Sequence, residues 1–253
     1  MERHAAHDCQ CASTEVNSCF SSCFSSRLLV TLFNVFMERS QVAEFHFIAS
    51  IANVGSILQH GIVSHNRAKG LLHCDISMRN IQDLRAKKKV PGGLALHDYA
   101  NLYFNGRNKM MAAKRPQYAE ICVLRVSPDV LDLPGAVIAD QNASSKYVLF
   151  LKSPAGLKKL SYDEVFVRSW ICADDQIREW RLGSAVCAEL LIPHKVEPRF
   201  IVGAYVRDRV SLSKFQGLCP SLPFAINSDI FLSDPNMIRV LLGNLLSRKP
   251  RPG

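Results

Sequence analysis

Residues 45–64, with the sequence FHFIASIANVGSILQHGIVS, constrain the fold of this chain more than any other stretch. The first residues favour a β-strand, whereas the apolar side chains after Asn53 recur at helical spacing and predict a short helix with one buried face. Asn53 is suited to cap that helix and Gly61 to end it, because glycine adopts a left-handed backbone without strain. A strand that leads directly into a helix presents free backbone N–H groups, which favour phosphate binding. The stretch is therefore either a nucleotide-binding unit or an ordinary strand–helix unit at a domain edge.

Composition narrows the class of protein. A hydrophobic share of 48% and a charged share of 21% are typical of a globular domain, and the net charge of +9 favours a polyanionic partner. Nine cysteines without regular spacing indicate a reduced, cytoplasmic protein rather than a disulfide scaffold. No apolar run reaches the roughly 20 residues that span a bilayer, so we expect no membrane partner.

The chain divides into three parts by composition. Residues 1–36 form a Ser- and Cys-rich extension outside the domain, which a translation start at Met37 would exclude. Residues 37–210 form the domain, and residues 211–253 form a partly disordered tail that ends in a basic, Pro-rich segment.

The extension contains two features that require interpretation. Residues 28–36 resemble the apolar core of a signal peptide, but the basic flank is thin and no cleavage site of small residues follows. The four cysteines do not have the paired spacing of zinc ligands, so we expect no metal site at Cys9, Cys11, Cys19 and Cys23.

Short strands outnumber helices in the predicted domain. After the opening unit we expect extended segments at 94–104, 120–126, 137–139, 146–151, 165–171, 184–192 and 200–205. Helices are expected near 77–85 and 174–180, with a helical turn at 154–160. This pattern predicts an α+β domain with a mixed or antiparallel sheet core.

Glu189 is the most informative single residue. In the predicted strand 184–192 it shares a face with Leu191 and other apolar side chains, where a carboxylate is costly unless it is paired or lines a cleft. It is therefore either salt-bridged at a sheet edge or part of a reactive site. Arg85 is its natural complement, because a guanidinium can bind a diphosphate through two parallel hydrogen bonds.

Two segments have properties of a nucleic-acid surface. The basic run Lys87, Lys88 and Lys89 is either a solvated surface or a set of phosphate contacts. In the predicted strand 94–104, His97 and Tyr99 begin a polar and aromatic face that could stack a base or could face solvent. The common nucleotide and hydrolase motifs, namely the P-loop, GxGxxG, HExxH and GxSxG, do not occur.

Four segments in this order and spacing resemble a known family. They are residues 45–66, 81–85, the block HDYANLYFNGRN at 97–108, and AELLIP at 188–193. Together they resemble the DarT family, toxins that attach ADP-ribose from NAD to a base in single-stranded DNA. The resemblance covers residues 44–207, and it implies the ADP-ribosyltransferase fold, a split β-sheet core with short helices that cradles NAD.

The resemblance assigns roles by position. It implies that Arg85 and Glu189 are catalytic and that NAD, the co-substrate, is bound without a metal by Phe47, Ile48, Ala49, Ser56, Val63 and Arg85. Family members often carry His, Thr and His in the first strand, where this chain has Phe47, Ala49 and Ser50. Backbone groups would then make these contacts here, or His46 would substitute after a shift of one residue.

The same resemblance implies partners and chemistry. Single-stranded DNA would be attracted by the lysine run and by Arg107, and a macrodomain antitoxin would remove the mark. Breaking the nicotinamide–ribose bond builds positive charge on the sugar, which Glu189 would stabilise. Arg85 would hold the phosphates and help to deprotonate the acceptor. No enzyme nucleophile is needed, because the acceptor base attacks.

Two other functions stay open. A transferase that acts on RNA, such as a tRNA 2′-phosphotransferase, fits the opening unit but needs several Arg and His side chains around a phosphate. A nucleic-acid-binding module without catalysis accounts for the charge but leaves Glu189 unexplained. Nicotinamide release with DNA separates an enzyme from a binding module, and exchange of DNA for RNA separates the two enzymes.

Overall fold

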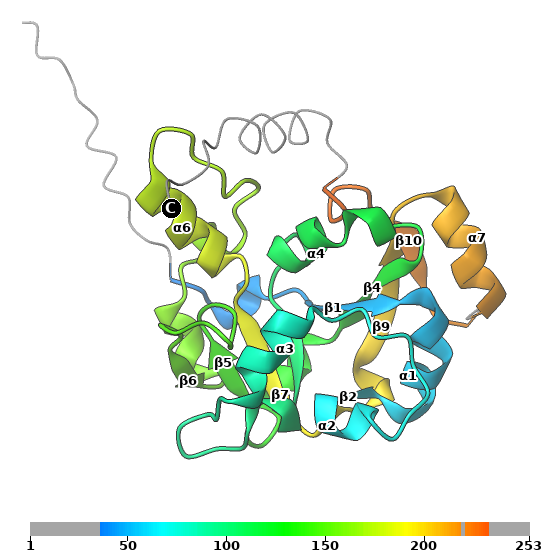
Figure 1. The fold of residues 1–253 in the computed structure, drawn as a ribbon, viewed down its shortest axis with the longest axis horizontal. Helices are drawn as coiled ribbons and strands as arrows, with labels where there is room; N and C mark the ends of the chain where they lie inside the picture. Colours follow the sequence, from blue (N-terminus) through cyan, green and yellow to red (C-terminus); the bar gives the residue numbers. More distant parts are fainter. Residues whose placement is uncertain (1–35, 219–220, 233–253) are drawn as a thin grey trace, which may run out of the picture. The chain divides into compact units, whose positions relative to one another are not determined.

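The computed structural model describes residues 36–218 and 221–232 (Figure 1). The strands are β1 (Phe45–Ser50), β2 (Ile62–Val63), β3 (Tyr99–Tyr103), β4 (Ile121–Val126), β5 (Val137–Ala139), β6 (Phe150–Lys152), β7 (Glu189–Pro193), β8 (Lys195–Val196), β9 (Ile201–Val206) and β10 (Phe224–Ile226). The helices are α1 (Val54–His60), α2 (His65–Ala68), α3 (Arg79–Ala86), α4 (Lys109–Ala113), α5 (Tyr162–Val165), α6 (Gln176–Ala185) and α7 (Arg209–Leu218). Short 3-10 turns lie at Arg39–Gln41, Ile51–Asn53, Leu96–Asp98, Arg115–Gln117, Pro128–Asp132, Ala155–Lys159 and Pro198–Phe200.

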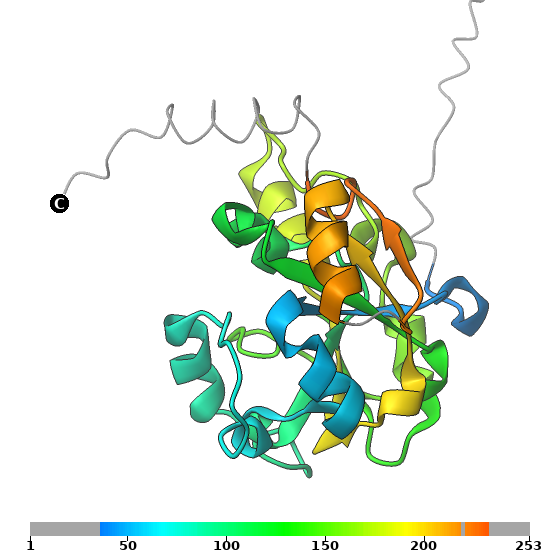
Figure 2. The same ribbon diagram turned by 90° about the vertical axis from the view of Figure 1, so that its right-hand side faces the viewer.

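Eight strands form one sheet in the order β10-β9-β4-β1-β3-β7-β5-β6, and β2 pairs with β8 in a separate ribbon. Within the described residues, β9 and β10 run parallel and the other pairs in the large sheet are antiparallel. The expected α+β class with a mixed sheet core is therefore confirmed. Both views place α4 and α6 on one side of β1, and α1, α2 and α3 on the other (Figures 1 and 2).

Strand β1 is central because both of its faces are covered. Phe45 belongs to one buried cluster and packs edge-to-face on Phe104, with ring centroids 4.8 Å apart. Ile48 belongs to a second cluster with Tyr103 and Val123. A strand buried on both faces has a continuous rather than alternating apolar pattern, which matches the sequence of this stretch.

The opening unit forms largely as predicted, with one correction. Gly61 ends α1 at φ 87°, and a Cβ there would collide with the carbonyl oxygen of Val196, so the position requires glycine. The side chain of Asn53 makes no capping bond to α1. Its amide instead pairs with both backbone groups of Cys74, at 2.8 Å each, because residues 71–78 fold back against this turn.

Several predicted boundaries are wrong. The segment 94–104 begins with the 3-10 turn Leu96–Asp98, so β3 contains only its second half. The segment 184–192 is split, because burial of Leu182 and Val186 keeps α6 helical to Ala185, and β7 begins at Glu189. Predicted strand 165–171 contains no strand, since α5 ends at Val165 and irregular chain follows. Of the segment 146–151 only the end is extended, as β6.

The packed structure continues beyond residue 210, where the sequence analysis ended the domain. Phe215 of α7 is fully buried and packs on Phe224 of β10, with ring centroids 5.8 Å apart. Phe231 and Leu232 are also buried, whereas residues 233–253 lie outside the described part. At the other end, Met37 is fully buried and its N–H donates to Leu160 O. Residues 1–35, with Cys9, Cys11, Cys19 and Cys23, are also not described.

Candidate functional site

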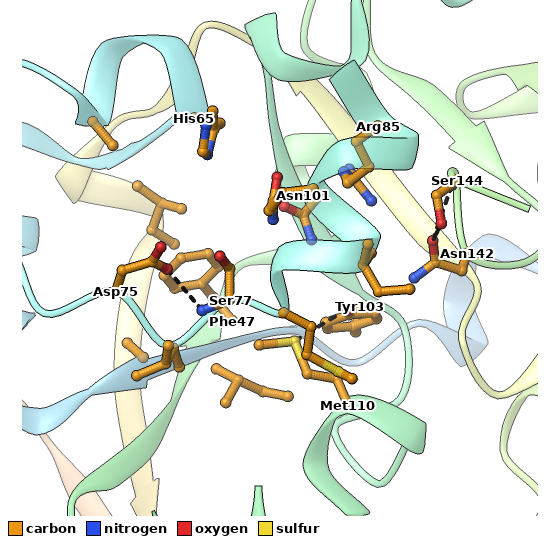
Figure 3. A pocket seen from close by; sticks show the side chains of 18 of the residues that line it. Phe47, His65, Asp75, Ser77, Arg85, Asn101, Tyr103, Met110, Asn142 and Ser144 are labelled. Carbon is orange, nitrogen blue, oxygen red and sulfur yellow. Dashed lines mark hydrogen bonds between the residues drawn. The ribbon is translucent and has the colours of Figure 1, made fainter. Parts of the chain in front are cut away.

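A cavity of about 520 Å³ lies where the opening unit meets α3, α4 and α6. One side is formed by β1, α1, β2, α2 and residues 71–78. The other side is formed by β3, α4, residues 141–145 and the end of α6. Figure 3 shows the residues that face this space, among them Phe47, His65, Asp75, Ser77, Arg85, Asn101, Tyr103, Met110, Asn142 and Ser144.

Arg85, which lines this cavity, forms a buried ion pair with Glu189, which is not among the lining residues. Arg85 Nη1 lies 3.2 Å from Glu189 Oε1 and 3.0 Å from Oε2. Arg85 is 5% exposed and Glu189 is fully buried, with Oε1 also accepting the N–H of Ala143 at 3.3 Å. The carboxylate on an apolar strand is therefore paired, which resolves the cost that the sequence predicted.

The second terminal nitrogen of the Arg85 guanidinium, Nη2, is available to bind a ligand. Nη2 of Arg85 is buried and has no hydrogen-bond partner among the described residues, and Arg85 lines the cavity. A buried donor without a partner costs free energy, so this nitrogen is suited to an anionic or carbonyl group of a ligand. The pair thus fixes the guanidinium through Nη1 and leaves Nη2 for binding.

The register of the sheet surrounds Glu189 with neutral groups. Tyr103 of β3 and Ala139 of β5 lie directly opposite it. Burial, together with the nearby Glu189 carboxylate, raises the pKa of Tyr103 well above 10, and its hydroxyl donates to the sulfur of Met110 at 3.4 Å. Tyr103 therefore stays protonated at neutral pH and does not act as a base.

Two histidines, His65 and His97, pack against each other beside the cavity. His65 of α2 packs on His97 with ring centroids 4.1 Å apart, and His97 Nε2 donates to Gln82 Oε1 of α3 at 3.1 Å. Burial, and then the neighbouring cations, lowers the pKa of both rings. The lowered pKa favours the uncharged form of both rings, of which His65 lines the cavity and His97 is bonded to α3, the helix that carries Arg85.

All residues predicted to bind NAD line this one cavity, namely Phe47, Ile48, Ala49, Ser56, Val63 and Arg85. The alternative role for His46 is wrong. His46 is buried away from the lining residues, where Nδ1 donates to Phe104 O and Nε2 lies 3.3 Å from Glu44. The first strand therefore meets the cavity through Phe47, Ile48 and Ala49.

Two predicted DNA contacts are wrong because the side chains are buried. Tyr99 is 4% exposed, and its hydroxyl accepts the N–H of Leu94. Arg107 is 6% exposed and donates to Arg168 O and to Asp229, so it joins distant parts of the chain. The partners of Arg107 lie far from it in the sequence, and the partner of Tyr99 lies in a turn that was not predicted. A local sequence pattern therefore could not reveal that these two side chains are buried.

The remaining predicted DNA contacts differ from one another. Lys87 and Lys89 are exposed, as a phosphate contact requires. Lys88 is partly buried, and its Nζ donates to the carbonyl oxygens of Ala143 and Ser145. It thereby ties the end of α3 to the loop that bonds Glu189. His97 is also half-buried, in the histidine pair described above.

Sequence reasoning missed the loop at 141–145 and the residues of α4 and α6 that line the cavity. Gln141, Asn142 and Ser144 line the cavity, and Ser144 donates to Asn142 through both its N–H and its hydroxyl. A run of small polar residues between two strands was the available signal. Within residues 36–218 and 221–232, no three His, Cys, Asp or Glu side chains are grouped to hold a metal ion. In the same ranges, no helix is long and apolar enough to cross a bilayer.

Comparison with known proteins adds a family. The family model described as "ssDNA thymidine ADP-ribosyltransferase, DarT" matches residues 45–232. A curated relative, the DNA ADP-ribosyl transferase–DNA ADP-ribosyl glycohydrolase fusion protein of Thermosipho africanus, is 29% identical over 173 residues. The match covers 65% of this chain and 42% of the relative, so the chain spans less than half of the fusion protein.

Solved structures share the fold. Thermosipho africanus DarTG in complex with ADP-ribose has a TM-score of 0.65 at 22% identity, and the match covers 75% of this chain and 51% of that one. Thermus sp. 2.9 DarT in complex with ADP-ribosylated ssDNA has a TM-score of 0.63 at 21% identity, covering 75% and 96%. The same Thermus protein in complex with NAD+ has a TM-score of 0.59 at 19% identity, covering 75% and 98%. These likenesses confirm the expected fold. Because the family model matches well over half of its 253 residues, the chain belongs to the DarT family.

Proposed function

We propose that this chain transfers ADP-ribose from NAD to a nucleobase in single-stranded DNA and releases nicotinamide. The observation that carries the proposal is the buried Arg85–Glu189 pair, whose arginine lines the cavity and has an Nη2 without a partner among the described residues. The family description names thymidine as the acceptor, and we adopt it for this chain. A cavity of about 520 Å³ is within the usual range for a site that binds a small molecule.

The two sides of the cavity suit the two substrates. NAD would lie against β1, α1 and residues 71–78, where Phe47, Ile48 and Ala49 present backbone and apolar surface and Ser56 and Val63 complete the wall. The DNA base would enter from the side of α4 and α6. Arg85 lines the cavity together with these two surfaces, and Glu189 is bonded to it in the buried layer next to the cavity, so we place the sugar carbon near Arg85.

The reaction needs one bond to break and one to form. The bond between nicotinamide and the ribose carbon breaks, and nicotinamide leaves with the bonding electrons as a neutral molecule. The acceptor nitrogen donates its electron pair to the same carbon, and its proton passes to water. Positive charge develops on the sugar, and the negative charge of Glu189, which is buried beside Arg85, would stabilise it.

Arg85 contributes charge and position. Nη2 of its guanidinium can donate to a phosphate oxygen or an acceptor carbonyl. Binding to the acceptor would lower the cost of removing its proton. Because Nη1 is bonded to both Glu189 oxygens, the arginine also holds the carboxylate in one orientation.

The RNA-directed alternative is less well supported. A 2′-phosphotransferase needs several arginines and histidines around one phosphate, whereas Arg85 is the only arginine among the described lining residues. A module that only binds nucleic acid has no use for a buried ion pair with a free donor. The wall of this cavity therefore favours a transferase.

Two further properties follow from the proposal. We infer a partner antitoxin that removes the mark, because the Thermosipho relative is named as a fusion with a DNA ADP-ribosyl glycohydrolase. We also place the activity in the cytoplasm, which fits the thiols of Cys74, Cys172 and Cys187 in the described part of the chain, none of which forms a disulfide.

The test uses four single-stranded oligonucleotides that differ only in one central base, and an RNA of matching sequence. Each is incubated with the protein and NAD, and mass spectrometry measures the gain of one ADP-ribose while nicotinamide release is followed in parallel. Equal amounts of modified thymidine oligonucleotide and free nicotinamide support the proposal. No NAD consumption, or preferential modification of RNA, contradicts it.

A further inference from the structure

A second cavity, of about 350 Å³, adjoins the first one. Gln141 and Ser184 line both cavities, so the two spaces meet at the end of α6 and the loop after β5. The second cavity extends from there along α6 to Trp180. In both views α6 lies on the same side of β1 as α4 (Figures 1 and 2).

Trp180 is exposed in a manner unusual for tryptophan. It is 63% exposed, whereas the other tryptophan of the chain, Trp170, is 6% exposed in the core. It lies one helical turn before Ser184, whose hydroxyl donates to the backbone oxygen of Trp180 at 2.8 Å. The ring is not an isolated exposed residue on a flat surface, because it lines the second cavity together with Ser184.

The charges around Trp180 fit a neutral ring better than a phosphate. Lys159 and Arg181 line the second cavity together with Asp140 and Glu164, and Arg181 is paired with Glu164 at 3.0 Å. The two cations thus share the cavity with two carboxylates, so their charges are largely balanced and the exposed ring is the dominant feature.

The spacing suits a nucleotide next to the acceptor. Trp180 and Ser184 are four positions apart, which corresponds to about 6 Å along the helix axis. Successive stacked bases are about 3.4 Å apart, so the ring lies within two base steps of the catalytic cavity. Aromatic side chains bind single strands by stacking on such bases.

We propose that Trp180 and the cavity beneath it form a stacking subsite for a base that flanks the acceptor base in the same DNA strand. This inference rests on the proposed function and adds a determinant of acceptor choice. The subsite acts on DNA binding alone, since Trp180 does not line the cavity that would take NAD.

The first experiment is a cycle of two changes, one in the protein and one in the DNA. Trp180→Ala is compared with the unchanged protein on oligonucleotides in which one flanking position at a time lacks its base. Loss of a base-stacking contact raises the KM for the oligonucleotide by about 5-fold or more. In the unchanged protein, we expect the KM to rise when the base at one flanking position is removed. In Trp180→Ala, removal of the same base should not raise the KM further.

The controls keep the fold and the chemistry constant. Trp180→Phe retains a ring and should restore most of the affinity, whereas Ile177→Ala removes a 77% exposed side chain of the same helix that lines neither cavity and should change nothing. The kcat and the KM for NAD should stay unchanged in all three variants. Thermal unfolding checks that each variant is folded.

Fluorescence gives a readout that does not depend on activity. Because Trp170 is buried, quenching by an added oligonucleotide should come from Trp180 and should disappear in Trp180→Ala. Active protein with equal oligonucleotide KM in Trp180→Ala overturns the subsite but leaves the proposed function intact. An unchanged protein that transfers no ADP-ribose overturns the proposed function, and fluorescence then still decides whether Trp180 binds single strands.

Discussion

Arg85 and Glu189 are 104 positions apart in the sequence, yet Nη1 of the arginine lies 3.0 and 3.2 Å from the two carboxylate oxygens. The arginine comes from α3 and the glutamate begins β7. Both side chains are buried, so replacing either one leaves the other as a buried charge without its partner. The pair therefore links the geometry of the helix to the central sheet.

Arg85→Lys should lower kcat/KM by about 100-fold or more, because lysine retains the charge but not the planar fork that bonds Glu189 and leaves Nη2 for a ligand. Steady-state kinetics against NAD concentration measures the effect. Arg79→Lys, at an exposed position of the same helix, is the matched control. Normal turnover in Arg85→Lys would count against the role of the fork.

Changing Lys87 and Lys89 together to glutamine should weaken DNA binding and flatten its salt dependence, because each phosphate contact releases a counterion. The two side chains are exposed, whereas Lys88 bonds the loop at 141–145 and should be left in place. Oligonucleotide binding across a salt series gives the slope. The KM for NAD should not change, and an unaltered slope would show that the run is only a solvated surface.

Asn53→Ala should raise the KM for NAD, because the Asn53 amide holds both backbone groups of Cys74 and thereby fixes residues 71–78 over the cavity. We expect an increase of about 5-fold or more from the loss of two hydrogen bonds of about 1 kcal/mol each. Gln59→Ala on the exposed side of α1 is the control. An unchanged KM would mean that the segment is held by its own packing.

Glu44 should make stability depend on pH in the acid range. Burial raises the pKa of Glu44, but hydrogen bonds with His46 and Arg125 outweigh this effect and lower the pKa from 4.5 to about 2. A carboxyl with a lowered pKa contributes stability above pH 4.5 and loses it as the pH falls toward 2. Chemical denaturation of Glu44→Gln should show a shallower loss between these values. An acid limb identical to that of the unchanged protein would contradict this assignment.

The opening strand and helix could be predicted because their signals are local. Helical spacing, Gly61 and the continuous apolar run of β1 all lie within about 20 residues of one another. Glu189 was also predictable, since a carboxylate on an apolar strand requires a partner. The partner itself could be proposed only because the family resemblance aligned Arg85 with it.

The errors share a physical cause, which is contact over long sequence distances. Arg107 looked like a surface cation in a turn, but its partner Asp229 lies 122 positions away. The helix α6 runs past its predicted end because Leu182 and Val186 pack in a cluster with Phe231, near the end of the described chain. No local pattern contains this information.

The most direct test of the account compares Glu189→Gln with the unchanged protein. Glutamine removes the negative charge but keeps the shape of the side chain and an oxygen that accepts from Arg85, whereas alanine would also remove that acceptor and leave a cavity. Transfer of ADP-ribose from NAD to a single-stranded thymidine oligonucleotide is measured in single turnover, with thermal unfolding as a check of folding. We predict that a folded Glu189→Gln protein loses about 100-fold or more of the rate. A folded variant with a near-normal rate would contradict the assignment of Glu189 as the group that stabilises charge on the sugar.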